Sequence, residues 1–353
     1  MAPSKKKGLF ISMEKLITFA IPSYNSAKFM HHCIESLLVA GDDAEIIIIN
    51  DGSKDNTGEV ADEYAAKYPG IVRAIHQENG GHGEGVNQGI RHAKGKYYKV
   101  VDSDDRLDSD SLLRFLDKVR ENEAKGIDID MYVCNYVYVR IDTGERRPMS
   151  YKHVFPLETV CTWDDTKPFG PSKYLMMHSV VYRTELLREC KIELPKHTFY
   201  VDNLYMYVPF PSVKSIYYMN EDMYLYYVGS DEQSVNEKNV LKRIDQQILV
   251  TKLVIDSHDL NDIEKQSRRL YRYMLHELSI LICICNIFLS IKGDKESVQK
   301  QKDLWQYLKA KDKRTYRKMR YAALCALTHF PGKVGRKATV GAYRIINKIY
   351  KPN

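Results

Sequence analysis

The sequence predicts an α/β fold in which helices flank a mostly parallel sheet and a helical appendage follows at the C-terminal end. Three observations predict it. Over the first 140 residues, continuous apolar runs alternate with segments of helical periodicity. Polar motifs follow the apolar runs directly. From about residue 239 the helical periodicity continues with no further strand pattern.

The first strand is expected at KLITFAIP, residues 15–22, because a run without polar alternation suits a strand buried on both faces. The segment AKFMHHCIESLL that follows repeats its apolar residues at helical spacing. Further units of strand and helix are expected, with strands at residues 45–51, 71–77 and 97–101. Strands that alternate with helices in this way pair in parallel, and such sheets bind ligands beyond the carboxyl ends of their strands.

The second part of the chain has a different pattern. Long aromatic strands are expected at 131–141 and 213–228, and helices from 239 onward. The apolar run at 278–291 is shorter than the ~20 residues of a membrane span, so we expect a buried or interfacial helix there. The domain boundaries expected are a leader at 1–12, one domain at 13–235 with halves at 13–125 and 126–235, a helical region at 236–330 and a tail at 331–353.

The composition narrows the class of protein. The chain of 353 residues is 44% hydrophobic, enough for a sizeable core. Its 7 cysteines are scattered through apolar segments, which indicates reduced thiols in a cytoplasmic protein rather than a disulfide framework or a zinc site. The first residues lack the pattern of a secretory signal.

The stretch VVDSDDRLD, residues 100–108, places the carboxylates of Asp102, Asp104, Asp105 and Asp108 close together at a strand exit. Like charges this close repel, so a cation is expected beside them. Asp102 and Asp104 share a face of an extended chain, and paired carboxylates suit Mg²⁺ or Mn²⁺. The alternative is helix capping, which Asp108 or Asp110 is expected to provide.

Four motifs, taken with their spacing, resemble those of family 2 glycosyltransferases with the GT-A fold: IPSYN (21–25), IIIINDGSKDNT (46–57), ENGGHGEGVNQGI (78–90) and GKYYKVVDSDD (95–105). The resemblance covers about residues 14–125 and extends less fully to about 235. It implies a Rossmann-like nucleotide-binding sheet. It also implies inverting transfer of a sugar from a nucleotide donor, usually a UDP-sugar, to an acceptor hydroxyl, with Mn²⁺ or Mg²⁺.

The same resemblance implies roles for residues at the strand ends. Pro22 and Tyr24 would form the wall against the nucleotide base, and Asp51 would accept a hydrogen bond from uracil. Asp104 would be the principal metal ligand, with Asp102 on the ribose or the metal. Further donor contacts are expected at Asn79, Gly81, Asn87 and Ser103. Val86 stands where the family often has Arg, so another group, with His82 as a candidate, would contact the diphosphate.

An inverting transfer also needs a base for the acceptor's proton. The resemblance places it in HTFYVDNLYMY, residues 197–207, at Asp202, where Val201 replaces a Glu that relatives often carry. The alternative is that Asp202 caps the following helix. Apolar and aromatic neighbours would raise the pKa of a partly buried carboxyl at this position.

The end of the chain is strongly basic, with 13 Lys or Arg and one acidic residue between residues 309 and 353. GKVGRKATVGAYRIINKIYK mixes these cations with apolar residues, as in helices that lie on anionic membranes. The alternative is a helix docked on the body of the protein. A membrane-associated acceptor, either lipid-linked or a cell-envelope glycan, and a peripheral position at the inner face of the cell membrane follow from the first interpretation.

Other classes of function fit less well. A nucleotidyltransferase would carry a Gly-rich loop after the first strand, and no such loop is present there. A non-catalytic, nucleotide-binding relative would lack a metal carboxylate or the base. No recognised nucleic-acid-binding motif is found, so no nucleic-acid partner is expected.

Overall fold

The computed structural model describes residues 15–171, 173–229, 237–321, 325, 328 and 332–350. The expected leader at 1–12 lies outside these residues. Within them, ten strands form one mixed sheet with the order β3-β2-β1-β4-β9-β6-β10-β5, to which β7 and β8 add at β6 and β10. The strands are β1 (Ile17–Ser23), β2 (Ala44–Asp51), β3 (Val72–Gln77), β4 (Tyr97–Val100), β5 (Arg106–Leu107), β6 (Met131–Arg140), β7 (Arg146–Met149), β8 (Val160–Cys161), β9 (Val180–Arg183) and β10 (Ile216–Val228).

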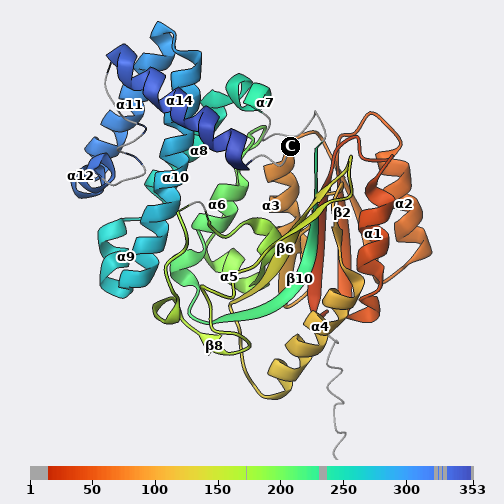
Figure 1. Cartoon of the computed structure of the whole chain (residues 1–353). Coiled ribbons are helices and arrows are strands. Elements are labelled where there is room, and N and C mark those ends of the chain that lie inside the picture. The colour runs from red at the N-terminus through yellow and green to blue at the C-terminus, as the bar shows by residue number, and fades with distance from the viewer. Residues whose placement is uncertain are drawn as a thin grey trace, which may run out of the picture.

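The first four strands of this order pair in parallel, as the alternation of strands and helices predicts. All seven residues of β1 are buried, which requires cover on both faces of the sheet. The cover comes from helices α1 (Met30–Leu38), α2 (Thr57–Lys67), α3 (His82–His92) and α4 (Ser109–Ala124) (Figure 1). The fold is therefore the predicted α/β sheet with flanking helices.

The second half of the sheet is mixed. β9 runs antiparallel to both β4 and β6, and the long strands β6 and β10 run parallel to each other. Five short helices lie between β8 and β10 in this half: η2 (Trp163–Asp165), η3 (Met177–Ser179), α5 (Thr184–Glu189), α6 (Asp202–Tyr207) and η4 (Phe210–Ser212). In the first half, η1 (Gly41–Asp43) precedes β2. Thus η3 and β9 bring residues 177–183 next to β4.

The C-terminal helices gather at one side of the sheet (Figure 1). They are α7 (Glu237–Lys242), α8 (Ile244–Ser257), α9 (Leu260–Gln266), α10 (Arg268–Lys292), α11 (Lys295–Lys311), α12 (Lys313–Tyr321) and α14 (Gly332–Tyr350). α10 lies at their centre and contacts α8, α9, α11 and α14. By length and composition, α10 is the one helix of the described residues that could cross a membrane, but 67% of its apolar window is buried inside the protein. Its apolar residues therefore form the core of the helical region, as the buried-helix prediction requires.

Candidate active site

The loops that follow β1, β2 and β4 meet at one edge of the sheet, because these strands run in the same direction. Side-chain hydrogen bonds join the loops to one another. The hydroxyls of Ser26 and Ser103 lie 2.8 Å apart, and the Asn25 amide donates to Ser53 Oγ at 3.0 Å. The strand ends that carry the sequence motifs therefore form a single connected site.

Asp51, at the end of β2, holds the loop that precedes α3. Its Oδ1 accepts hydrogen bonds from Gln77 Nε2 (2.6 Å) and the Gly80 amide (2.7 Å), and its Oδ2 accepts one from the Gly81 amide (2.8 Å). Asn79 donates back to the Asp51 carbonyl at 2.8 Å. Gly81 has a φ of 82°, a conformation that favours glycine. Asp51, Asn79 and Gly81 thus belong to one network.

The other residues expected to bind the donor lie at different depths. Tyr24 is 48% exposed, whereas Pro22 is buried and packs against Gly85 of α3. Ser103 is buried at its hydrogen bond with Ser26. Tyr24 is therefore accessible to a ligand at this edge of the sheet.

Asn87 is buried and connects α3 to a distant loop. Its Nδ2 donates to the Leu194 carbonyl and its Oδ1 accepts from the Leu194 amide, both at 2.9 Å. Two residues on, a Cβ at Gly89 would come within 2.6 Å of Ala20, so only glycine allows α3 to pack this closely on β1. The Asn-x-Gly motif thus holds the α3 helix between the sheet and the chain segment that leads to Asp202.

The carboxylates after β4 lie beside two histidines from other elements. His82 Nε2 is 2.9 Å from Asp102 Oδ1, and His178 Nε2 is 3.7 Å from Asp102 Oδ2 and 3.9 Å from Asp105 Oδ2. Asp105 is buried and accepts hydrogen bonds from the Tyr224 hydroxyl (2.7 Å) and the Tyr227 amide (2.8 Å). Three chain segments thus bring potential ligands together.

His178, in η3, is an unusual residue of this group. Its side chain is only 6% exposed, and neither ring nitrogen has a hydrogen-bond partner among the described residues. Its ring stacks on Tyr226 at 4.3 Å and meets the edge of Tyr224 at 4.5 Å. A buried polar group without a partner is costly, so a ligand or ion at its nitrogen would be favourable.

The electrostatics of the cluster are perturbed. Burial would raise the pKa of Asp102, but His178 and His82 outweigh it and hold that pKa below its ordinary value. Burial and then the charge of Asp102 raise the pKa of Asp105 well above its usual range. The carboxylates therefore repel one another, which a bound cation would relieve.

These residues fit a divalent cation. Ligand atoms of Asp102, Asp105 and His178 all lie within 4.8 Å of one another, and carboxylate oxygens with an imidazole nitrogen are a common donor set. Asp104, the ligand expected from the resemblance, is exposed at the same turn and is not part of this triplet. Asp102 is the group shared by the expected pair and the observed cluster.

Asp202 is the first residue of α6, and its Oδ1 accepts a hydrogen bond from Asn203 Nδ2 at 3.4 Å. Burial raises its pKa, while His82 and His178 act in the opposite direction. The charges of the cluster therefore influence the ionisation of Asp202. The loop before it contains His197 (φ 51°) and Tyr200 (φ 67°), two non-glycine residues in the left-handed region, a type of strain that gathers at functional sites.

Two residues of this site lie outside the sequence-based predictions. One is His178, whose position next to Asp102 depends on the pairing of β9 with β4. Lys99 is fully buried on β4, where Nζ donates to the carbonyls of His178 (2.8 Å) and Val180 (3.2 Å), and burial lowers its pKa to about 7. A lysine inside the apolar run YYKVV is the sequence signal that could have identified it.

A cavity of about 1050 Å³ lies at the opposite edge of the sheet. Lys15 and Lys94, which line it, come just before β1 and β4, at the amino ends of the strands. Several of its charges are paired with each other, as in Lys96 with Asp128 (2.9 Å) and Arg183 with Asp130 (3.0 Å). Its position and its paired charges separate it from the site at the carboxyl ends.

Comparisons with known proteins agree on a family. A model described as "Glycosyl transferase family 2" matches residues 18–185. The uncharacterized glycosyltransferase YibD of Escherichia coli is 30% identical over 245 residues, which cover 67% of this chain and 70% of YibD. The uncharacterized glycosyltransferase EpsJ of Bacillus subtilis is 38% identical over 125 residues, 35% of this chain and only 35% of EpsJ.

Two further comparisons concern proteins with more specific names. A poly(ribitol-phosphate) beta-glucosyltransferase of Bacillus spizizenii is 31% identical over 186 residues, 51% of this chain and 27% of that protein. The crystal structure of S. aureus TarS 1–349 in complex with UDP-GlcNAc is similar with a TM-score of 0.65 at 18% identity, covering 95% of this chain and 91% of that one. At this identity the likeness establishes the shared fold.

Proposed function

The chain belongs to glycosyl transferase family 2 and is a glycosyltransferase, and on that premise we propose an inverting, metal-dependent transfer from a UDP-sugar. The acceptor we propose is a hydroxyl of a lipid-linked or cell-envelope glycan. The observation that carries the proposal is the cluster of Asp102, Asp105, His82 and His178 at the strand ends, whose two histidines also oppose the rise in the pKa of Asp202. The UDP-GlcNAc in the TarS complex and the polymer named for the Bacillus spizizenii enzyme support the classes of donor and acceptor.

In this proposal the donor lies over the ends of β1, β2 and β4. The exposed ring of Tyr24 stacks on the base, and the network of Asp51, Asn79 and Gly81 shapes the loop beside it. Asp102, with Asp104 or with Asp105 and His178, would hold a Mn²⁺ or Mg²⁺ ion. That ion, when bound, supplies positive charge that stabilises the departing diphosphate.

Asp202 acts as the base of the transfer. Its raised pKa lets the carboxylate accept the proton of the acceptor hydroxyl as that oxygen bonds to the anomeric carbon. The two hydrogen bonds between Asn87 and Leu194 connect α3 to the chain that leads to Asp202 and so help to position the base relative to the donor. We accordingly assign donor binding to residues 13–125 and acceptor binding to 126–235.

We also propose that the protein works in the cytoplasm, bound peripherally at the inner face of the cell membrane. α14 contacts α10, with the rings of Tyr343 and Phe288 5.8 Å apart, and Gly335 and Thr339 of α14 are buried. It leaves Val334 exposed at 81%, and its exposed residues also include Ile345, Lys333, Lys337 and Arg344. Both interpretations of the basic tail thus fit together, since the helix docks and still presents cations with apolar side chains to an anionic surface.

Calorimetric titration of UDP, with and without Mn²⁺, tests this function on the wild type and on Asp104→Ala. We expect UDP binding that depends on Mn²⁺ and that weakens in the variant. UDP binding that is equal in the presence of a chelator would instead indicate a nucleotide-binding relative without metal-dependent transfer.

Titration of Mn²⁺ alone separates the two possible ligand sets. Loss of Mn²⁺ binding in His178→Ala with retention in Asp104→Ala would assign the ion to Asp102, Asp105 and His178. The reverse result would assign it to Asp102 and Asp104. Asp262→Ala on α9, far along the chain from the cluster, serves as a matched control that should bind as the wild type does.

A further inference from the structure

Two depressions on the acceptor side of the molecule have no acidic residue among their described lining. The tyrosine pocket, about 70 Å³, is formed by Tyr136, Tyr138, Tyr151, Lys173 and Tyr174 with their neighbours. The basic pocket, about 160 Å³, includes Lys167, Phe169, Arg269, Arg272, Tyr273 and His276. Three other cavities of the described structure, in contrast, have acidic residues in their walls.

The two pockets are adjacent. Lys167 and Phe169 line the basic pocket, and a few residues on Lys173 and Tyr174 line the tyrosine pocket. The ring of Phe169 lies 6.3 Å from Tyr151 of one pocket and 4.3 Å from Tyr273 of the other. His276 Nε2 is 3.2 Å from the Lys173 carbonyl. Aromatic rings and one hydrogen bond thus connect the two pockets, and together we call them the strip.

The cations of the strip are unpaired. Lys167, Lys173, Arg269 and Arg272 form no ion pair and no side-chain hydrogen bond with any residue that the structure describes. Arg269 and Arg272 are one turn apart on α10 and line the same pocket, with Arg272 exposed to solvent. Cations that gather in concave surfaces without acids favour binding of anions.

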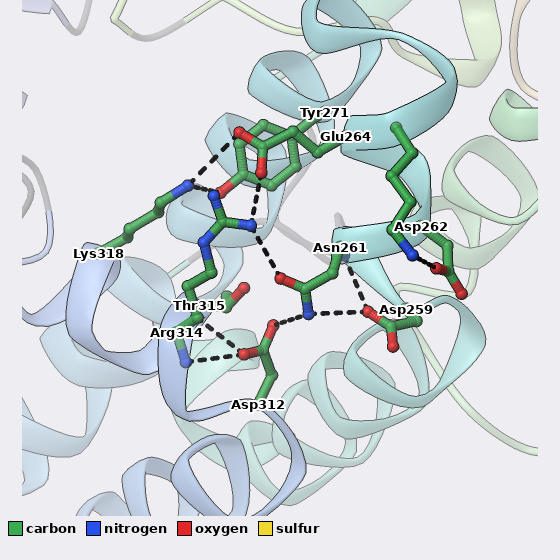
Figure 2. Close-up of polar contacts among 10 residues, drawn as sticks. Asp259, Asn261, Asp262, Glu264, Tyr271, Asp312, Arg314, Thr315 and Lys318 are labelled. Atoms are coloured by element: carbon green, nitrogen blue, oxygen red, sulfur yellow. Dashed lines mark hydrogen bonds and ion pairs between the residues drawn. The ribbon is translucent and has the colours of Figure 1, made fainter.

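Another group of cations in the same helical region shows the contrast. Arg314 Nη1 lies 2.6 Å from Glu264 Oε2, and Lys318 Nζ lies 3.8 Å from Glu264 Oε1 and 2.6 Å from the Tyr271 hydroxyl (Figure 2). Tyr271 belongs to the same turn of α10 as Arg269 and Arg272. The cations of α12 next to Tyr271 are thus neutralised by Glu264. In contrast, the guanidinium groups of Arg269 and Arg272 on α10 remain available to a ligand.

The tyrosine pocket leads to the catalytic groups. Tyr138 packs against Tyr226 with centroids 5.6 Å apart, and Tyr226 stacks on His178 at 4.3 Å. Burial, then the charges of Tyr138 and Asp202, raise the pKa of Tyr174, which agrees with a position of Tyr174 near the base. The strip therefore extends from the carboxylate cluster toward α10.

We propose that this strip is the acceptor subsite and that the acceptor is an anionic glycan, one that carries phosphodiester or carboxylate groups. The tyrosine rings contact sugar faces next to Asp202, and Lys173, Lys167, Arg269 and Arg272 contact the acidic groups of units further along the chain. Arginine suits both anions because its planar guanidinium donates two parallel hydrogen bonds. The inference rests on the proposed transferase function and narrows its acceptor class.

Binding of labelled polymers tests the proposal without donor or metal, so its result is independent of transfer. The probes are poly(ribitol phosphate), hyaluronate and neutral dextran, measured by fluorescence anisotropy at low and high salt. The pocket variant carries Lys167→Gln, Arg269→Gln and Arg272→Gln. The control variant carries Lys292→Gln on α10 and Lys295→Gln and Lys302→Gln on α11, three exposed lysines outside the two pockets, and so removes the same charge elsewhere.

The wild type and the control variant are expected to bind one of the two polyanions, and salt should weaken the binding. The pocket variant should bind about tenfold more weakly, the sum of several exposed charge contacts. The polyanion that binds identifies phosphodiester or carboxylate groups as the ligand. Absence of binding to either polyanion, equal binding of dextran, or equal losses in the two variants would overturn the proposal.

A UDP titration with Mn²⁺ on the same variants distinguishes this result from failure of the transferase function. UDP should bind the pocket variant as it binds the wild type, because the strip does not include the donor edge. Melting temperatures within about 2 °C of the wild type would confirm that the exposed substitutions leave the fold intact.

Discussion

The donor edge of the sheet and the contact between α9 and α12 use acidic residues in opposite ways. At the donor edge, Asp102 and Asp105 lie together, and no Lys or Arg within the described chain forms an ion pair with them. Between α9 and α12, Glu264 has two cationic partners, and the Asp312 side chain accepts hydrogen bonds from the backbone at the start of α12 (Figure 2). The paired charges hold helices together, and the unpaired ones are available to a ligand.

The two regions also differ in how their charges affect the stability of the fold. Burial and mutual repulsion disfavour the ionised forms of Asp105 and Asp202, so the donor edge is not arranged for stability. The pairs of Glu264 are partly exposed and are individually weak. Substitutions should therefore affect activity in the first region and stability, only slightly, in the second.

The largest effect is expected at Asp202. Asp202→Asn removes the proposed base but leaves the donor loops in place, so sugar transfer should fall about 10²–10⁴-fold while UDP binding is retained. Stability should be unchanged or slightly higher, since a buried carboxylate is replaced by an amide. Transfer kinetics and thermal melting measure both. Asp262→Asn is the control, because it makes the same change at a carboxylate paired with Lys265, and it should have no effect on transfer. If Asp202→Asn keeps a transfer rate within tenfold of the wild type, Asp202 is not the base.

The next effect concerns a buried acid that belongs to neither region. Glu277 is buried in α10, and burial raises its pKa to about 8, opposed by a hydrogen bond from Tyr273. Between about pH 4.5 and pH 8 the Glu277 carboxyl therefore stays protonated in the folded protein, whereas it is ionised in the unfolded chain. The unfolding free energy should therefore fall as the pH rises from about 5 to 8, by on the order of 4 kcal/mol from this group.

Glu277→Gln should remove that part of the pH dependence, because the amide has no proton to lose in this range. Denaturant unfolding at pH 5 and pH 8 measures the difference. Glu264→Gln is the matched control, with the same chemical change at a paired glutamate. Identical slopes of stability against pH in Glu277→Gln and in the wild type would show that Glu277 is not protonated in the folded protein.

The smallest effect is expected in the paired region. Glu264→Gln weakens the contacts with Arg314 and Lys318, which should cost about 1 kcal/mol or less. The double variant with Arg314→Gln, compared with both single variants, isolates the pair energy. The loss should shrink at high salt, and UDP binding should not change. A change in UDP binding would mean that the two regions are energetically coupled.

Much of the donor half could be predicted from its sequence. A strand buried on both faces has a continuous apolar run, as β1 and β2 do, and the polar residues at its end mark the binding edge. The prediction of buried helix at 278–291 is confirmed by α10. The roles assigned to Asp51, Asn87, Asp104 and Asp202 stay predictions, although the structure places Asp51 and Asn87 in networks that support the site.

The acceptor half could be predicted less well, because its contacts are far apart in the sequence. β9 enters the sheet antiparallel between β4 and β6, a pairing that no local pattern signals. Because β9 pairs with β4, His178 lies next to Asp102. The buried Lys99 side chain of β4 stabilises this arrangement through its hydrogen bond to the His178 carbonyl. A lone histidine after two methionines has no feature in the sequence that distinguishes it from ordinary core filling.

The sequence by itself determined the alternation of strands and helices, the edge where the strands end and the carboxylates gathered there, because periodicity and turn chemistry are local properties. Only the tertiary structure decided which charges are paired. Ion pairs depend on distance in space, so the pairing of Arg314 with Glu264 and the isolation of Arg269 and Arg272 in the basic pocket follow from how α9, α10 and α12 pack.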